Sequence, residues 1–254
     1  MIFFPLDGLI WFSVFLVLLM FVQRTLHREL IAILLILTRR PAVTQILFSI
    51  IFLPGVVLHE SSHFLMAKLL GVKTGRFSII PRTTADGRWQ MGYVETAPGG
   101  ILRDAFIGLA PLVAGCLLVA YIAKYQISLL VLKDFAQAGY WELFWMGIGL
   151  LPKMPDFWLW FYLTFAISST MLPSASDRRA WVPMGLLVGF VVGLGLIAGA
   201  GSWLAQNIAP PFNNFLGGVA ALFGISVIVH ACLILPLGLF HRALSRITGL
   251  DLRE

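Results

Sequence analysis

The sequence predicts an all-α polytopic membrane protein with about six transmembrane helices and one β-hairpin. Of the 254 residues, 59% are hydrophobic and only 12% are charged, whereas charged residues make up about a quarter of a typical soluble domain. The mean hydropathy is +0.91. Several uncharged runs also approach the length of about 20 residues that a hydrocarbon core of about 30 Å requires. This composition excludes an ordinary soluble globule, and the 13% of aromatic residues exclude a disordered chain.

The charge balance points to lipid rather than to nucleic acid. The formal net charge is +6, but no run of Lys or Arg and no nucleic-acid-binding signature interrupts the apolar segments. Basic residues at helix ends contact lipid headgroups in membrane proteins, so we predict the lipid bilayer as a partner. Cys116 and Cys232 lie far apart in apolar segments without CxxC spacing, which indicates neither a disulfide framework nor a thiolate zinc site.

Residues 1–41 are predicted to form an N-terminal span followed by an interfacial segment. The apolar run 8–22 has no basic region before it and no small-residue cleavage site after it. It therefore resembles a retained span rather than a signal peptide. The apolar patch 30–38 lies between charged residues and is too short to cross, so we expect it to lie in the membrane interface.

Residues 42–181 are predicted to form the central unit of the chain. A second long apolar segment covers residues 42–70. Charges return after it, and polar and apolar residues alternate near Asp86-Gly87, a dipeptide that favours a hairpin turn. We therefore expect a β-hairpin over residues 76–96.

Two further spans are predicted at residues 105–123 and 157–176, which are uncharged runs of 19 and 20 residues. The intervening segment 125–153 has only one short apolar run and an aromatic patch, and we expect it to be a loop that lies on the membrane. The C-terminal unit 182–254 is predicted to hold two spans, separated by a turn at 206–214, and a short basic tail.

The second long segment contains the sequence His59-Glu60-Ser61-Ser62-His63, an HExxH motif. Residues i and i+4 share one face of a helix, so His59 and His63 can offer two imidazoles to one metal ion. Glu60 would then reach a metal-bound water as general base. The alternative is that the two histidines are satisfied polar residues in helix contacts, or that they bind metal without catalysis.

A catalytic zinc site needs a third protein ligand and an open fourth position. Asp177 is the best candidate because it ends the uncharged segment 157–176, whereas the other aspartates flank spans, belong to the predicted turn or lie near the termini. The alternative for Asp177 is a partner for a neighbouring arginine or a helix cap. His230 stands alone in an apolar span, which is more typical of a packed helix contact than of a ligand.

With these residues, the sequence resembles the site-2 protease family of intramembrane zinc metalloproteases. The resemblance covers about residues 52–181 and follows the order LHESSHF, a hairpin, GLAPLVAG and MLPSASD. It implies that His59 and His63 are zinc ligands and that Glu60 is the general base. It also implies that Asp177 is the third zinc ligand.

The chain departs from the family pattern at four residues and in one spacing, since Pro173 lies one residue closer to Asp177 than is usual. Ala110 stands where the family prefers Gly, and Arg178 follows the aspartate where the family has Gly. Ala114 and Thr170 stand where the family has asparagines that are thought to hold the substrate backbone. The zinc ligands are unaffected, but an inactive or regulatory pseudoprotease becomes an alternative.

We therefore expect an enzyme, a zinc-dependent membrane metalloendopeptidase with one Zn²⁺ ion, acting on single-span or membrane-associated protein substrates. One rival is a non-proteolytic membrane zinc-binding or transport protein with glycine- and proline-broken helices. Another is a protein that resembles prenyl-protein endoproteases, whose third ligand is a Glu on a later helix. Glu95 and Glu142 are not inside convincing spans, which argues against this second rival.

The basic residues also suggest an orientation. Lys68 and Arg178 are predicted to lie on the cytoplasmic side, which places the zinc site nearer the cytoplasmic face of what we expect to be a prokaryotic cytoplasmic membrane. In this layout of six spans, Arg28 lies outside and Arg242 lies inside.

Overall fold

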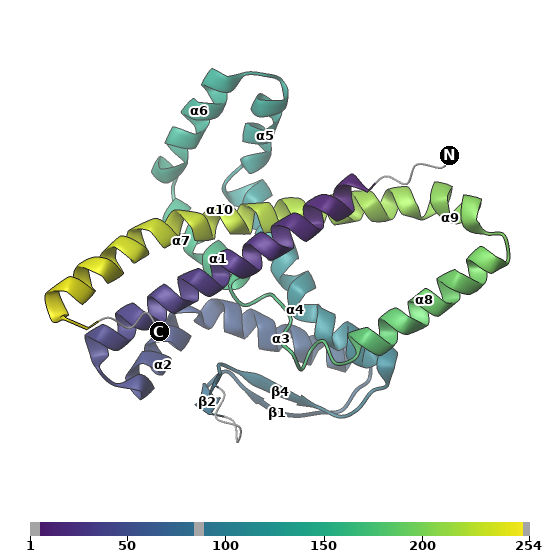
Figure 1. The fold of residues 1–254 in the computed structure, drawn as a ribbon, viewed down its shortest axis with the longest axis horizontal. Coiled ribbons are helices and arrows are strands. Elements are labelled where there is room, and N and C mark those ends of the chain that lie inside the picture. Colours follow the sequence, from purple (N-terminus) through teal and green to yellow (C-terminus); the bar gives the residue numbers. More distant parts are fainter. Residues whose placement is uncertain (1–5, 84–88, 251–254) are drawn as a thin grey trace.

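The fold is mostly helical. It is taken from a computed structural model that describes residues 6–83 and 89–250. Figure 1 shows two long helices lying side by side, shorter helices crossing beneath them, a helical pair at one side and a small β-hairpin at the other. The helices are α1 (Asp7–Thr38), α2 (Pro41–Ile51), α3 (Leu53–Leu69), α4 (Ile101–Tyr121), the π-helix η1 (Ile122–Gln126), α5 (Leu129–Gln137), α6 (Trp141–Leu150), the 3₁₀-helix η2 (Leu151–Lys153), α7 (Phe157–Ser168), α8 (Trp181–Ile197), α9 (Gly201–Asn207) and α10 (Ala209–Thr248). The strands are β1 (Thr74–Ser78), β2 (Arg82–Thr83), β3 (Trp89–Gln90) and β4 (Tyr93–Thr96).

The first and last helices, α1 and α10, pack in parallel along their length. Near their N-terminal ends, the Gly8 amide donates a hydrogen bond of 2.9 Å to the Asn213 side chain. Near their C-terminal ends, Nδ1 of His241 lies 2.6 Å from the Glu29 carboxylate. The prediction of a span at 8–22 and a separate interfacial patch at 30–38 was wrong, because both belong to the single helix α1. No Gly or Pro interrupts the helix between them.

The described residues contain three helices long and apolar enough to cross a membrane, or up to five if each of two bent helix pairs counts as one span. The predicted number of about six is not confirmed. If α1 and α10 both cross the membrane, their parallel direction requires that the chain reverses an even number of times between them. The number of spans from α1 to α10, counting both, is then odd. The sequence-based layout with Arg28 and Arg242 on opposite sides is not compatible with this pairing, because these residues neighbour the bonded Glu29 and His241.

The segment 42–70 is two helices rather than one span. Helices α2 and α3 meet at Phe52 with a bend of 72°. Pro54 lies in the first turn of α3, where its missing N–H is tolerated but prevents continuation of the preceding helix. The bend gives α3 its own direction, beneath α1 in Figure 1.

Two loop or turn predictions were wrong because helices form there. Most of the segment 125–153 is helical, and α5 and α6 form an antiparallel pair that projects from the molecule in Figure 1. The predicted turn at 206–214 is helical as well, since Pro210 and Pro211 fit the first turn of α10. The chain reverses earlier, at Gly199, whose φ of +86° is easily adopted only by glycine.

Helix α7 ends much earlier than the predicted span 157–176. It stops at Ser168 after 12 residues, and Pro173 disfavours helical geometry in the residue before it. The remaining segment, 169–180, forms no regular helix or strand. It leads back across α3 and α4 and carries Asp177.

The β-hairpin lies between α3 and α4 in the chain, as predicted. In the described part of the chain, β1 pairs antiparallel with β4, and β2 pairs antiparallel with β3. The register joins Phe77 to Val94 and Arg82 to Gln90. The expected turn residues Asp86 and Gly87 lie outside the described residues.

Candidate metal centre

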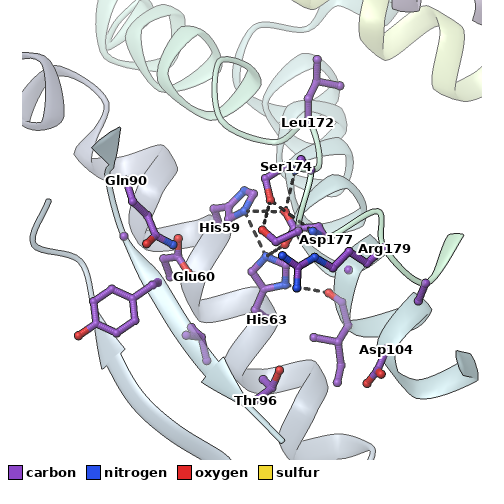
Figure 2. A pocket seen from close by; sticks show the side chains of 18 of the residues that line it. His59, Glu60, His63, Gln90, Thr96, Asp104, Leu172, Ser174, Asp177 and Arg179 are labelled. Carbon is purple, nitrogen blue, oxygen red and sulfur yellow. Dashed lines mark hydrogen bonds and ion pairs between the residues drawn. The ribbon is translucent and has the colours of Figure 1, made fainter. Parts of the chain in front are cut away.

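The HExxH motif lies on continuous helix. All its residues belong to α3, and one helical turn separates His59 from His63. Their rings are 4.8 Å apart between centroids, and the two Nε2 atoms are 3.2 Å apart. Figure 2 shows both imidazoles directed to the same point, where Asp177 also points.

Backbone carbonyls orient both imidazoles. Nδ1 of His59 lies 2.7 Å from the carbonyl oxygen of Thr170, and Nδ1 of His63 lies 2.8 Å from that of Ile107. A carbonyl oxygen can only accept a hydrogen bond, so each Nδ1 carries a proton and donates it. Each Nε2 is then left as the metal-binding atom of a neutral imidazole, an arrangement common among metal-ligating histidines.

Asp177 completes the group from the loop between α7 and α8. Its Oδ2 is 3.6 Å from Nε2 of His59, and its Oδ1 is 3.3 Å from Nε2 of His63. The Ser174 amide donates a 2.7 Å hydrogen bond to Oδ2, and the Ser174 hydroxyl accepts one from the Asp177 amide. These bonds fix the carboxylate within its turn, as Figure 2 shows.

The same contacts keep the carboxyl group of Asp177 ionised. Burial acts to raise the pKa of Asp177, but in the absence of a metal ion hydrogen bonds from Nε2 of protonated His59 and His63 imidazoles outweigh burial and hold the pKa well below its ordinary value. A carboxylate must be deprotonated to bind a metal ion. Asp177 therefore has the charge state that a ligand requires.

Small residues allow the helices to approach closely around the site. A Cβ atom added to Gly108 of α4 would lie 2.0 Å from the carbonyl oxygen of Asp177. One added to Gly55 of α3 would lie 2.2 Å from the carbonyl oxygen of Ala166 in α7. Only glycine permits these two approaches, so the chain supplies it where α3, α4 and the Asp177 loop meet.

The donor set fits a metal ion. The ligand atoms of His59, His63 and Asp177 all lie within 4.8 Å of one another, and the group could hold one ion. Ligands at about 2.0–2.2 Å from a tetrahedral zinc ion are separated from each other by about 3.3–3.6 Å. The two Nε2 atoms are 3.2 Å apart, close to that spacing. The contacts of 3.3 and 3.6 Å to Asp177 involve different carboxylate oxygens, so with one ligand atom from each residue the three atoms lie within 4.8 Å of one another.

Glu60 lies beside this group but is not part of it. It is buried on α3, with 7% of its surface exposed. Figure 2 shows its side chain between the imidazoles and the hairpin. Gly92 packs against it closely, since a Cβ atom there would lie 2.8 Å from Cγ of Glu60. The hairpin thus confines the Glu60 side chain within the site.

The group opens into a cleft of about 1240 Å³. One wall is the hairpin, including Gln90, Gly92, Tyr93, Val94 and Thr96. In the described sheet β4 pairs only with β1, so the edge of β4 away from β1 is free along this cleft.

Several contributing residues could not be found from the sequence. The carbonyls of Ile107 and Thr170 are backbone groups and leave no pattern, and Gln23 and His27 of α1 line the cleft without any motif. His230 is a helix contact, hydrogen-bonded to the Ser169 hydroxyl and to the Ser226 carbonyl.

Comparison with protein-family models, with curated proteins and with solved structures finds no match for the chain. The functional conclusion therefore rests on the residues and their geometry.

Proposed function

We propose that the protein is an intramembrane zinc metalloprotease that hydrolyses peptide bonds of membrane-embedded proteins. The supporting observation is the convergence of His59, His63 and Asp177, whose ligand atoms lie within 4.8 Å of one another, with Glu60 next to His59 on the same helix. This donor set, two imidazoles and a carboxylate with an open position, is typical of catalytic zinc. The proposal includes membership of the site-2 protease family.

A zinc ion in this group would polarise the scissile carbonyl and lower the pKa of a coordinated water. Glu60 accepts the proton of the attacking water and can pass it to the leaving amine, as a general base and then acid. His59 and His63 keep their orientation during this step because their Nδ1 protons are bonded to carbonyls. The confined Glu60 side chain loses little freedom on reaching its working position.

The free edge of β4 can hold a substrate in extended form. A membrane helix hides its peptide bonds in internal hydrogen bonds, so its backbone must unwind before hydrolysis. An extended segment can then add to β4 as a further strand. The Ala97 amide donates to the Lys73 carbonyl on the β1 side, and alternation along the strand directs the Val94 amide towards the cleft.

Removal of this amide is expected to weaken cleavage without affecting the metal centre. Val94→Pro deletes an N–H that does not pair with β1, and proline is tolerated on free strand edges. We expect a rise in KM for a single-span substrate of about tenfold or more, with zinc content unchanged, in kinetics of the purified protein in nanodiscs. Val94→Ala, which keeps the N–H, is the control. Equal KM values for the two variants would contradict strand addition.

An inactive metal-binding relative is the second candidate, and one observation favours it. The Thr170 hydroxyl bonds to the carbonyls of Ala166 and Ile167 in the preceding helix, α7. It is therefore engaged away from a substrate backbone, and Ala114 offers no polar side chain in its place. A zinc transport protein would share the metal ligands but have no need of Glu60.

The proposal is tested by metal removal. Chelation of purified protein is expected to abolish cleavage of single-span substrates, and one equivalent of Zn²⁺ is expected to restore it, because the ion supplies part of the chemistry. Metal analysis gives the stoichiometry, and gel analysis gives the cleavage. A protein that binds one zinc but cleaves no substrate in a panel would favour the second candidate.

A further inference from the structure

A hydrogen-bonded chain of polar groups lies next to the metal centre, where α1, α7 and α10 meet. The Ser169 hydroxyl is 2.9 Å from Nε2 of His230, and Nδ1 of His230 is 2.8 Å from the carbonyl oxygen of Ser226. The side-chain amide of Gln23 donates to the carbonyl oxygen of Ser169. His230 is 0% exposed and Ser169 is 2% exposed, so these bonds are shielded from water.

The direction of each bond follows from the carbonyl acceptors. Because the Ser226 carbonyl only accepts, Nδ1 of His230 carries the proton and Nε2 accepts from the Ser169 hydroxyl. Ser169 is thus held twice, by α10 through its hydroxyl and by α1 through its carbonyl. Neither helix contributes a metal ligand or Glu60.

Ser169 precedes Thr170, the residue whose carbonyl oxygen accepts the Nδ1 proton of His59. Both residues follow Ser168, the last residue of α7. The Thr170 and Met171 amides donate to the Ile167 carbonyl near the end of α7, and groups outside that helix supply the remaining contacts of this segment. Gln23 holds the adjacent peptide through the Ser169 carbonyl, and His230 holds the Ser169 side chain.

We propose that Ser169 and His230, together with Gln23, are positioning residues that hold the Thr170 carbonyl against His59 and so orient a metal ligand. This inference rests on the metal centre of the proposed function. It makes the parallel α1–α10 pair part of the metal site's support: a shift of either helix moves the Thr170 carbonyl and rotates the His59 imidazole.

A purely structural role predicts a different result. If the chain of bonds only joins helices, its loss lowers thermal stability but leaves the ligands of the folded protein unchanged. If it positions His59, its loss changes the affinity and coordination geometry of the metal. Zinc affinity and the visible absorption spectrum of the Co²⁺-loaded protein separate these roles, because neither depends on turnover.

The neighbouring Ser168 supplies a matched control. It is also 0% exposed, but its hydroxyl bonds only to the carbonyls of Thr164 and Phe165 in its own helix. Ser168→Ala and Ser169→Ala each remove one buried hydroxyl from adjacent positions. Only Ser169→Ala leaves Nε2 of His230 without its donor.

We expect Ser169→Ala to lower zinc affinity by about tenfold, the lower end of the range for lost outer-shell partners of a metal ligand, and to shift the Co²⁺ spectrum. Ser168→Ala is expected to match the wild type in both measurements. His230→Gln, which keeps an acceptor for Ser169, is expected to retain more affinity than His230→Leu. Equal zinc affinity and equal spectra for Ser169→Ala and Ser168→Ala would overturn the inference.

The same preparations separate this inference from the proposed function. A wild type that binds zinc but cleaves nothing contradicts the protease activity, while the comparison of the two serine variants still decides the positioning role. A wild type that binds no zinc or Co²⁺ contradicts both.

Discussion

Glu60→Gln is expected to abolish most peptide cleavage while zinc remains bound. The amide has nearly the shape of the carboxylate but cannot accept a proton from water, and general base catalysis typically contributes about 10²- to 10⁴-fold. We therefore expect kcat to fall by that factor with KM little changed. Zinc content is expected to equal that of the wild type because the ligands are His59, His63 and Asp177.

Glu142→Gln is the control for this substitution. Glu142 lies on α6, is exposed, and does not line the cleft, so its variant is expected to cleave at the wild-type rate. If Glu60→Gln cleaves at the wild-type rate, Glu60 is not the general base. If neither the wild type nor Glu60→Gln cleaves a substrate but both transport zinc, the transport alternative is favoured instead.

The placement of the HExxH side chains could be predicted because it depends on spacing within one helix. His63 follows His59 by four positions, and helical periodicity alone places both on one face, with Glu60 next to His59. Asp177 was predicted by a weaker argument, its place at the end of an uncharged segment. The structure brings its carboxylate to the imidazoles.

The support of the site could not be predicted, because it consists of long-range contacts. The His59 proton is accepted by a carbonyl 111 residues away, and a backbone group has no sequence signature. Likewise Ser169 and His230 are 61 residues apart. A single histidine in an apolar span is compatible with many helix contacts, so the sequence identifies the contact type but not the partner.

Hydropathy located apolar segments but not the bends or breaks within them. Pro54 bends the segment 42–70 between α2 and α3, and the early end of α7 frees residues 169–180 to carry Asp177. The mean hydropathy of a segment does not depend on whether its helix is straight. A proline in the first turn can begin a new helix with a different direction while the segment stays apolar. The two features that broke the expected spans are also those that position the metal centre.

Asp177→Ala is expected to lower zinc affinity by more than about 100-fold. Loss of an outer-shell partner of a ligand alone lowers metal affinity by about 10- to 100-fold, and loss of a ligand itself has a larger effect. Two neutral imidazoles would remain, without the one anionic group. Competition with a chelator of known affinity measures the loss. Asp134→Ala removes an exposed carboxylate from α5 and is the control. Asp177→Asn tests the charge separately, since it keeps an oxygen that can accept from the Ser174 amide. Wild-type affinity of Asp177→Ala would exclude Asp177 as the third ligand, and with it the open tetrahedral site on which the proposed hydrolysis depends.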